Sequence, residues 1–174
     1  MADSPPYYLG LFRALATEGV RYLVVGGVAV NLHGAERLTM DIDLMLSMDA
    51  QNLRRFLRAA TSMQLRPAVL PVTLKQFCDS ATVEGWIRDR HMLAFQLRGP
   101  GVEDPSVDIL VKTPMPFDQA YVRRVRMSLG GVAVDVASVE DLVALKSDTG
   151  REIDKSDIRA LQRLEQLRSR QRDD

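Results

Sequence analysis

The segment from Tyr22 to Leu46, YLVVGGVAVNLHGAERLTMDIDLML, constrains this chain more than any other part of it. A short apolar run typical of a buried strand stops at a pair of glycines, and a short helical segment follows. The residues 39–46 then alternate between polar and apolar, which places Asp41 and Asp43 on one face of a strand, ~7 Å apart. Two carboxylates on one face repel each other unless a cation or exposure to water relieves them.

A divalent cation is the favoured explanation for this acidic pair, and oxygen ligands of this kind suit Mg²⁺ or Mn²⁺. Asp108 is the single acid in the apolar run 107–112, which predicts a third carboxylate on a neighbouring strand. Three such carboxylates are typical of two-metal sites for phosphoryl or nucleotidyl transfer. Asp41, Asp43 and Asp108 are therefore the predicted catalytic and metal-binding residues.

Gly26 and Gly27 fit the same chemistry, because a glycine turn between a strand and a helix lets backbone N–H groups approach a phosphate closely. Alone, the glycine pair is weak evidence and a plain tight turn is an adequate explanation. An isolated Asp-x-Asp is equally weak and is more often an exposed strand. The two motifs in this order, with a short segment between them, form a more specific pattern.

The same segment resembles the signature of the nucleotidyltransferase superfamily, which has the DNA polymerase beta-like fold. Gly-Gly-x-Ala, then His-Gly, then Arg-x-Thr-x-Asp-Ile-Asp is similar to the bacterial AbiEii-type toxin nucleotidyltransferases. A second stretch, Ser138 to Ile158, SVEDLVALKSDTGREIDKSDI, is similar to a downstream segment of that family. The resemblance implies a nucleoside triphosphate substrate, an Mg²⁺ or Mn²⁺ cofactor and an antitoxin protein as partner.

The resemblance also implies roles for basic residues. Lys146 and Arg151 match downstream positions that hold the triphosphate, although Lys146 could instead rest its stem on apolar surface, and Arg151 could pair with Asp154. Arg37 is expected to contact the nucleotide, to pair with the acids or to form a structural salt bridge. Val28 departs from the superfamily, in which a Ser or Thr commonly follows the glycines.

The length of 174 residues suits one domain with a real core, and 46% apolar and 26% charged residues are ordinary for a globular protein. The predicted fold class is α/β (α+β), with a small central mixed sheet flanked by helices. We expect a single nucleotidyltransferase-like domain, residues 1–174, with a sheet-containing catalytic core at 1–136 and C-terminal helices at 137–170. The other predicted elements are a helix over 8–18, a helix at 50–60 capped by Asp49, a short helix at 74–77, strands at 91–97 and 107–112, a hairpin of 121–129 with 132–136, and a last helix lined by Ile153, Ile158, Leu161, Leu164 and Leu167.

The charges balance, with 23 basic and 23 acidic residues, which excludes a binder that depends on bulk positive charge. Residues 50–78 nevertheless contain five bases and no acid, and Arg54, Arg55 and Arg58 predict either a solvated helix face or a guide for an anionic acceptor such as an RNA end. The single cysteine, Cys78, excludes an intramolecular disulfide framework. The sequence favours a cytoplasmic protein without a membrane segment.

These observations predict a metal-dependent nucleotidyltransferase that moves a nucleotidyl group from a nucleoside triphosphate to a hydroxyl of RNA, a protein or a small molecule. A toxin of a toxin–antitoxin or phage-defence pair is one form of this hypothesis, and a homodimer is compatible with it. Two alternatives stay open. One is a degenerate member that binds a nucleotide or partner without turnover, and the other is a small-molecule enzyme of the antibiotic-modifying kind, for which the chain offers little acceptor-binding domain.

Overall fold

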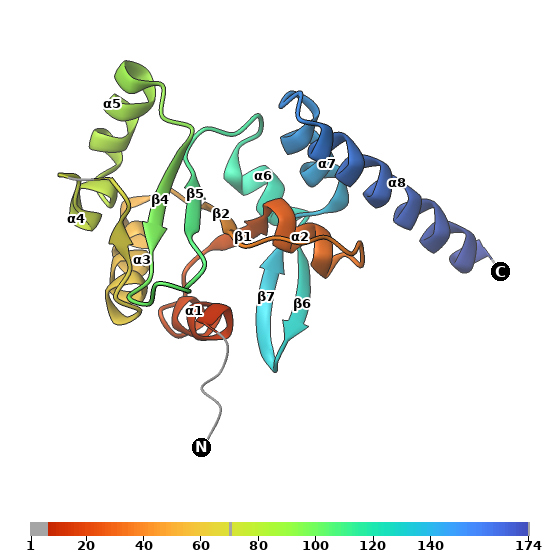
Figure 1. Ribbon diagram of the computed structural model, residues 1–174, viewed down its shortest axis with the longest axis horizontal. Coiled ribbons are helices and arrows are strands. Elements are labelled where there is room, and N and C mark those ends of the chain that lie inside the picture. Colours follow the sequence, from red (N-terminus) through yellow and green to blue (C-terminus); the bar gives the residue numbers. More distant parts are fainter. Residues whose placement is uncertain (1–6, 70, 174) are drawn as a thin grey trace.

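The structure is a computed structural model that describes residues 7–69 and 71–173 (Figure 1). The strands are β1 Tyr22–Val25, β2 Ile42–Leu46, β3 Arg66–Pro67, β4 Ala94–Arg98, β5 Val107–Leu110, β6 Val125–Leu129 and β7 Val132–Val136. The helices are α1 Tyr7–Thr17, α2 Gly26–Leu32, α3 Ala50–Ser62, α4 Leu74–Phe77, α5 Ser80–Arg90, α6 Phe117–Val122, α7 Val139–Ser147 and α8 Glu152–Asp173. Within the described residues the strands form one seven-stranded mixed sheet in the order β3-β4-β5-β2-β1-β7-β6. The predicted fold class is confirmed.

The centre of the sheet is the unit β1-α2-β2. The two strands pair antiparallel, with Val25 opposite Asp43 and Tyr22 opposite Leu46. Strand β5 adds parallel to β2, and β7 adds parallel to β1. Because β2 lies between β1 and β5, its side chains have strand neighbours on both sides, and this arrangement decides the surroundings of Asp43.

One face of the sheet holds the aromatic core. Phe95 of β4 lies opposite Ile109 of β5, which in turn lies opposite Leu44 of β2. Helices α3, α4 and α5 cover this face, and the ring of Phe77 stacks on Phe95 with centroids 4.3 Å apart. Because alternate residues of a strand point to opposite faces, Asp43 and Asp108 point away from this core.

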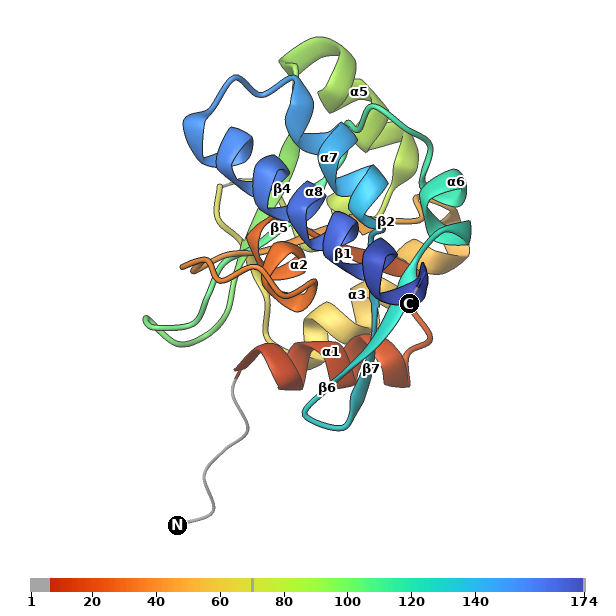
Figure 2. The same cartoon turned by 90° about the vertical axis from the view of Figure 1, so that its right-hand side faces the viewer.

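Helices α7 and α8 pack on one another and lie beside α2, over the part of the sheet away from α3 to α5 (Figure 2). Helix α7 is capped by Ser138, whose hydroxyl accepts from the backbone N–H of Asp141 at 3.1 Å. Gly150, with φ +70°, ends the connection that leads into α8. None of the helices in the described part of the chain is long and apolar enough to cross a membrane.

Several predicted elements are confirmed and others were wrong. The cap at Asp49, the short helix after Thr73 and the hairpin β6–β7 appear as predicted. The predicted strand at 39–46 is shorter, because β1 ends at Val25 and gives its first residues no partner. Met40, expected on the apolar face, is 78% exposed.

The other differences lie in the helical parts. The residues 117–122 form α6, so the strand predicted from 121 begins only at Val125, and α5 was not predicted at all. In α8, Ile153 and Leu167 are about half exposed, while Asp154 and Asp157 are buried beside Leu161. Acidic residues thus occupy part of the face that the pattern assigned to apolar ones.

Candidate active site

Two of the predicted carboxylates lie side by side at the centre of the sheet. Asp43 of β2 and Asp108 of β5 are direct partners in the register of the parallel pair. Neighbouring strands lie ~4.8 Å apart, and direct partners point to the same face. On the far side of Asp108 its partner is Gln96 of β4, so polar side chains follow one another across three strands.

Asp41 lies just before β2 and is exposed. Its carboxylate accepts a hydrogen bond of 2.6 Å from the hydroxyl of Ser106, at the start of β5. The backbone N–H of Ile42 donates to the carbonyl of the same serine at 2.9 Å. Ser106 therefore fixes Asp41 at the end of the β2–β5 pair, a role that no motif in the sequence indicated.

Glycine is required at position 26 because Asp43 occupies the space of a side chain there. A Cβ on Gly26 would lie 1.8 Å from Oδ2 of Asp43, and the backbone has φ +63°. The same holds at Gly27, where a Cβ would lie 2.7 Å from the hydroxyl of Thr39. The glycine pair thus lets the start of α2 approach the acidic strand closely.

The Asp43 carboxyl is destabilised as an anion. Burial raises its pKa to about 6, and the negative charges of Asp108 and Asp41 act in the same direction. Lys146 and Arg37 oppose this increase from across the site. Burial also raises the pKa of Asp108, whose Oδ1 is buried and has no hydrogen-bond partner among the described residues.

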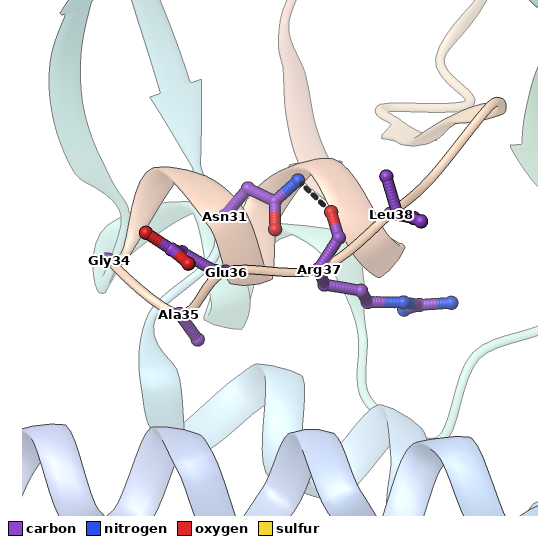
Figure 3. A pocket seen from close by; sticks show the side chains of 6 residues that line it. All are labelled: Asn31, Gly34, Ala35, Glu36, Arg37 and Leu38. Carbon is purple, nitrogen blue, oxygen red and sulfur yellow. Dashed lines mark hydrogen bonds between the residues drawn. The ribbon is translucent and has the colours of Figure 1, made fainter.

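Arg37 extends from the loop between α2 and β2 toward α8. Its guanidinium donates to Asp157 at 2.7 Å, which realises the structural salt bridge among the three predicted possibilities. A bond of 2.7 Å from the side chain of Asn31 to the carbonyl of Arg37 holds this loop over a hollow of about 540 Å³ (Figure 3). Nη1 of Arg37 lies 3.0 Å from the position of a Cβ on Gly27, so the cation sits against the start of α2.

Lys146 is buried between two carboxylates of α8. Its amine lies 2.9 Å from Asp154 and 2.8 Å from Asp157, and it is not a solvent-exposed amine on an apolar stem. Arg151 pairs with Asp154 at 2.6 Å, as the alternative prediction for it stated. Asp157 thus joins Arg37 to Lys146 and connects the loop of α2 with α7 and α8. The only feature of the sequence that could have indicated the burial of Asp154 and Asp157 is their three-residue spacing on an otherwise apolar helix face.

The carboxylates of the site meet some of the requirements of a divalent cation. Across residues 7–69 and 71–173, no group of three or more His, Cys, Asp or Glu side chains is already arranged to hold an ion. The orphaned oxygen of Asp108, in register with Asp43, is nevertheless what an ion shared by two carboxylates requires. The pair fits the cation, with Asp41 at its edge.

The arginines of the acid-free stretch lie elsewhere. Arg58 pairs with Glu18 at 2.6 Å, and Arg55 donates to the carbonyl of Gly19 at 3.1 Å, both at the end of α1. Helix α3 follows β2, so these contacts lie at the opposite end of β2 from Asp43. This position does not support the prediction that Arg54 and its neighbours guide an acceptor into the site.

Comparison with solved structures gives the fold. The lincosamide antibiotic adenylyltransferase LnuA, with lincomycin bound, is 16% identical with a TM-score of 0.58, over 92% of this chain and 98% of that one. The antibiotic-resistance protein ANT(2")-Ia, in complex with adenylyl-2"-tobramycin, is 13% identical in sequence with a TM-score of 0.53, over 95% of each chain. A nucleotidyltransferase-like protein from Paracoccidioides brasiliensis is 19% identical with a TM-score of 0.55, over 92% of this chain and 75% of that one.

The chain therefore has a nucleotidyltransferase-like fold. No protein-family model matches the chain, and no curated protein matches it. The narrower resemblance to the AbiEii-type toxins finds no support among these comparisons.

Proposed function

We propose that this protein transfers a nucleotidyl group from a nucleoside triphosphate to a hydroxyl acceptor in the presence of Mg²⁺ or Mn²⁺. The observation that carries the proposal is the in-register pair of Asp43 and Asp108, against which a glycine brings the start of α2 into close contact. Two half-buried carboxylates side by side cost stability that Lys146 and Arg37 offset only in part, so a binding role accounts best for the pair. The likeness in fold to nucleotidyltransferases supports the same function.

In this proposal Asp41, Asp43 and Asp108 hold the metal, and the residues around them hold the nucleotide. When bound, the ion neutralises the carboxylates and polarises the phosphoryl group. Gly26 and Gly27 let the phosphates approach the backbone at the start of α2. Nε of Arg37 is buried and lacks a partner among the described residues, so in this proposal the side chain turns before Nε donates to a phosphate oxygen.

The bond changes are those of an in-line substitution. The acceptor oxygen forms a new bond to the α-phosphorus, the bond from that phosphorus to the bridging oxygen breaks, and pyrophosphate leaves with the electron pair. In this proposal Asp108, in register with Asp43, receives the proton of the hydroxyl. Lys146 and Arg151 place positive charge beside the leaving phosphates, and Asp154 and Asp157 keep Lys146 in position.

The test is the transfer of label from each α-labelled nucleoside triphosphate, with Mg²⁺, to RNA, protein or small molecules of a cell extract. Asp43→Asn and Asp108→Asn should each reduce transfer by at least ~100-fold, because each removes a charge that the metal and transition state need. Asp89→Asn, an exposed aspartate of α5, is the matched control and should transfer at the parent rate. A chelator should stop transfer and added Mg²⁺ should restore it.

Absence of transfer from every nucleotide, with retained nucleotide binding, would favour the alternative of a binding-only protein. The toxin role, the antitoxin partner and the homodimer stay predictions of the sequence resemblance. Growth arrest on expression of the parent chain, but not of Asp43→Asn, would support the toxin prediction, and light scattering measures the oligomeric state.

A further inference from the structure

A second hollow, of about 400 Å³, opens beside Asp41 between α1, α2 and the end of β6. Tyr8 of α1, Val28 and Leu32 of α2, and Leu129 of β6 form its walls, and Asp41 stands at its edge. Sites for small molecules commonly have volumes of ~300–1,000 Å³ and mostly apolar walls. This hollow has both properties and adjoins the proposed transfer site.

Its walls are held in place by close packing. A Cβ on Gly130, in the turn of the β6–β7 hairpin, would lie 2.7 Å from Cδ1 of Leu9, so the hairpin is seated directly on α1. The core residues Leu11 and Leu15 fix α1 in turn, because both are fully buried. The hollow is therefore a feature of the packed elements and not of one loop.

The lining is mainly apolar throughout. Apolar side chains come from α1, α2 and the hairpin and also from Met40, Ile42 and Pro105, on the segments that carry its two carboxylates, Asp41 and Glu103. Among the described residues that line the hollow, none is Lys or Arg. A nucleic-acid strand is bound chiefly through its phosphates by basic side chains, so this lining disfavours RNA.

The position of Val28 in the wall of the hollow suggests a role for this residue in binding an apolar ligand. The residue after the glycine pair contributes its apolar side chain to the hollow. A hydroxyl at this position would put a polar group into an apolar wall. The departure of Val28 from the superfamily pattern therefore fits a surface adapted to an apolar ligand.

We propose that this hollow binds the acceptor, and that the acceptor is a small, uncharged or cationic molecule with an apolar body and a hydroxyl. The apolar body lies against Val28, Leu32 and Leu129, and the hydroxyl points past Asp41 toward the nucleotide. The inference rests on the proposed nucleotidyl transfer for the reaction itself. The small-molecule alternative then needs no larger acceptor domain, because α1, α2 and the hairpin supply the site.

Binding is tested first, without any reaction. Saturation-transfer NMR with 2-cyclohexylethanol should show binding to the parent protein, and glycerol should show none. Val28→Thr keeps the side-chain shape and should weaken binding of the probe about tenfold, since a small change in an apolar pocket has effects of that size. Val122→Thr, an exposed residue of α6, is the matched control and should bind like the parent.

Transfer is tested next, with α-labelled nucleoside triphosphate and the same probe as acceptor. Val28→Thr should raise the KM for the probe and leave the KM for the nucleotide unchanged. The inference is overturned if the parent does not bind the probe, if Val28→Thr binds it as tightly as the parent, or if RNA is labelled in preference to it. Failure of the proposed function is recognised separately, because Asp43→Asn would then transfer label as well as the parent.

Discussion

At the residue scale, the raised pKa of Asp43 predicts the pH dependence of stability. Because the folded protein binds this proton more tightly than the unfolded chain, the contribution of Asp43 to stability is fully present below pH ~4 and is lost as the pH rises through about 6. In the presence of chelator, Asp43→Asn should therefore be more stable than the parent at pH 8, by on the order of 2 kcal/mol. Urea unfolding across pH 4 to 8 measures the difference, which should vanish near ~pH 4.

A bound metal ion should make the parent more stable than Asp43→Asn, the reverse of their order in chelator. Added Mg²⁺ binds the folded parent through its carboxylates and should stabilise it, whereas Asp43→Asn should respond much less. A parent and variant with the same stability at pH 8 without metal would show that Asp43 carries no such penalty.

Gly26 gives a second prediction at this scale. Gly26→Ala should destabilise the protein by about 2–5 kcal/mol, because the new Cβ meets Asp43 and the backbone has a positive φ. Gly131→Ala separates the two causes, since its φ is +79° and nothing lies within 4 Å of the new Cβ. It should cost only ~1–2 kcal/mol in thermal or urea unfolding. Equal losses in both variants would argue against the close approach of Asp43.

At the scale of elements, the ion pairs that join α7 to α8 are the feature to test. Lys146→Met removes the cation that Asp154 and Asp157 share and leaves each of these buried acids with one arginine, and should cost on the order of 2–3 kcal/mol. Lys155→Met removes a lysine from an exposed pair with Glu152 one turn away and should cost less than ~0.5 kcal/mol. Chemical unfolding of both variants gives the comparison, and a loss at position 146 no larger than at 155 would contradict it.

The same junction is sensitive to acid. Hydrogen bonds from Thr149, Lys146 and Arg151 lower the pKa of Asp154 to about 2 against the opposing effect of burial. The stability that Asp154 contributes is therefore present above its ordinary pKa and is lost as the pH falls through about 2. The stability difference between the parent and Asp154→Asn should narrow over the same interval, from pH ~4 downward.

Elements with strong local signals could be predicted, and those that depend on distant partners could not. The caps at Asp49 and Ser138 and the glycine pair of the hairpin act within a few residues, so the pattern contained them. The buried acids of α8 did not follow from a pattern, because their burial depends on Lys146 and on Arg37, which is 120 residues away from Asp157.

At the scale of the whole molecule, the arginines of α3 and the acidic site lie at opposite ends of β2. The double charge reversal Arg54→Glu with Arg58→Glu should therefore leave transfer to a small acceptor within about twofold of the parent. Arg151→Glu, beside the proposed triphosphate position, should reduce it strongly. A salt-dependent loss of activity in the double variant would instead restore the prediction that α3 guides an anionic acceptor.

The acidic residues of the candidate site could be predicted from the sequence, whereas the contacts of its basic residues could not. Asp41 and Asp43 share one segment, and Asp108 is alone in an apolar run, so spacing sufficed for them. Only the three-dimensional arrangement places Ser106 on Asp41, and Lys146 between two carboxylates. The sequence alone does not show whether a lysine or arginine binds a phosphate or belongs to a buried ion pair.

The central position of β2 also has a consequence for how the protein folds during its synthesis. During synthesis the chain emerges from its N-terminus, so β1, α2 and β2 precede the partner strand β5, and Lys146 and α8 come last. Asp108 follows with β5, and until α7 is made the three carboxylates lack Lys146, one of the two opposing cations. We therefore expect the nascent protein to be catalytically inactive until its final helix has docked. Its folding should also be slow for its size, because the pairing of β2 with β5 and of β1 with β7 closes long loops.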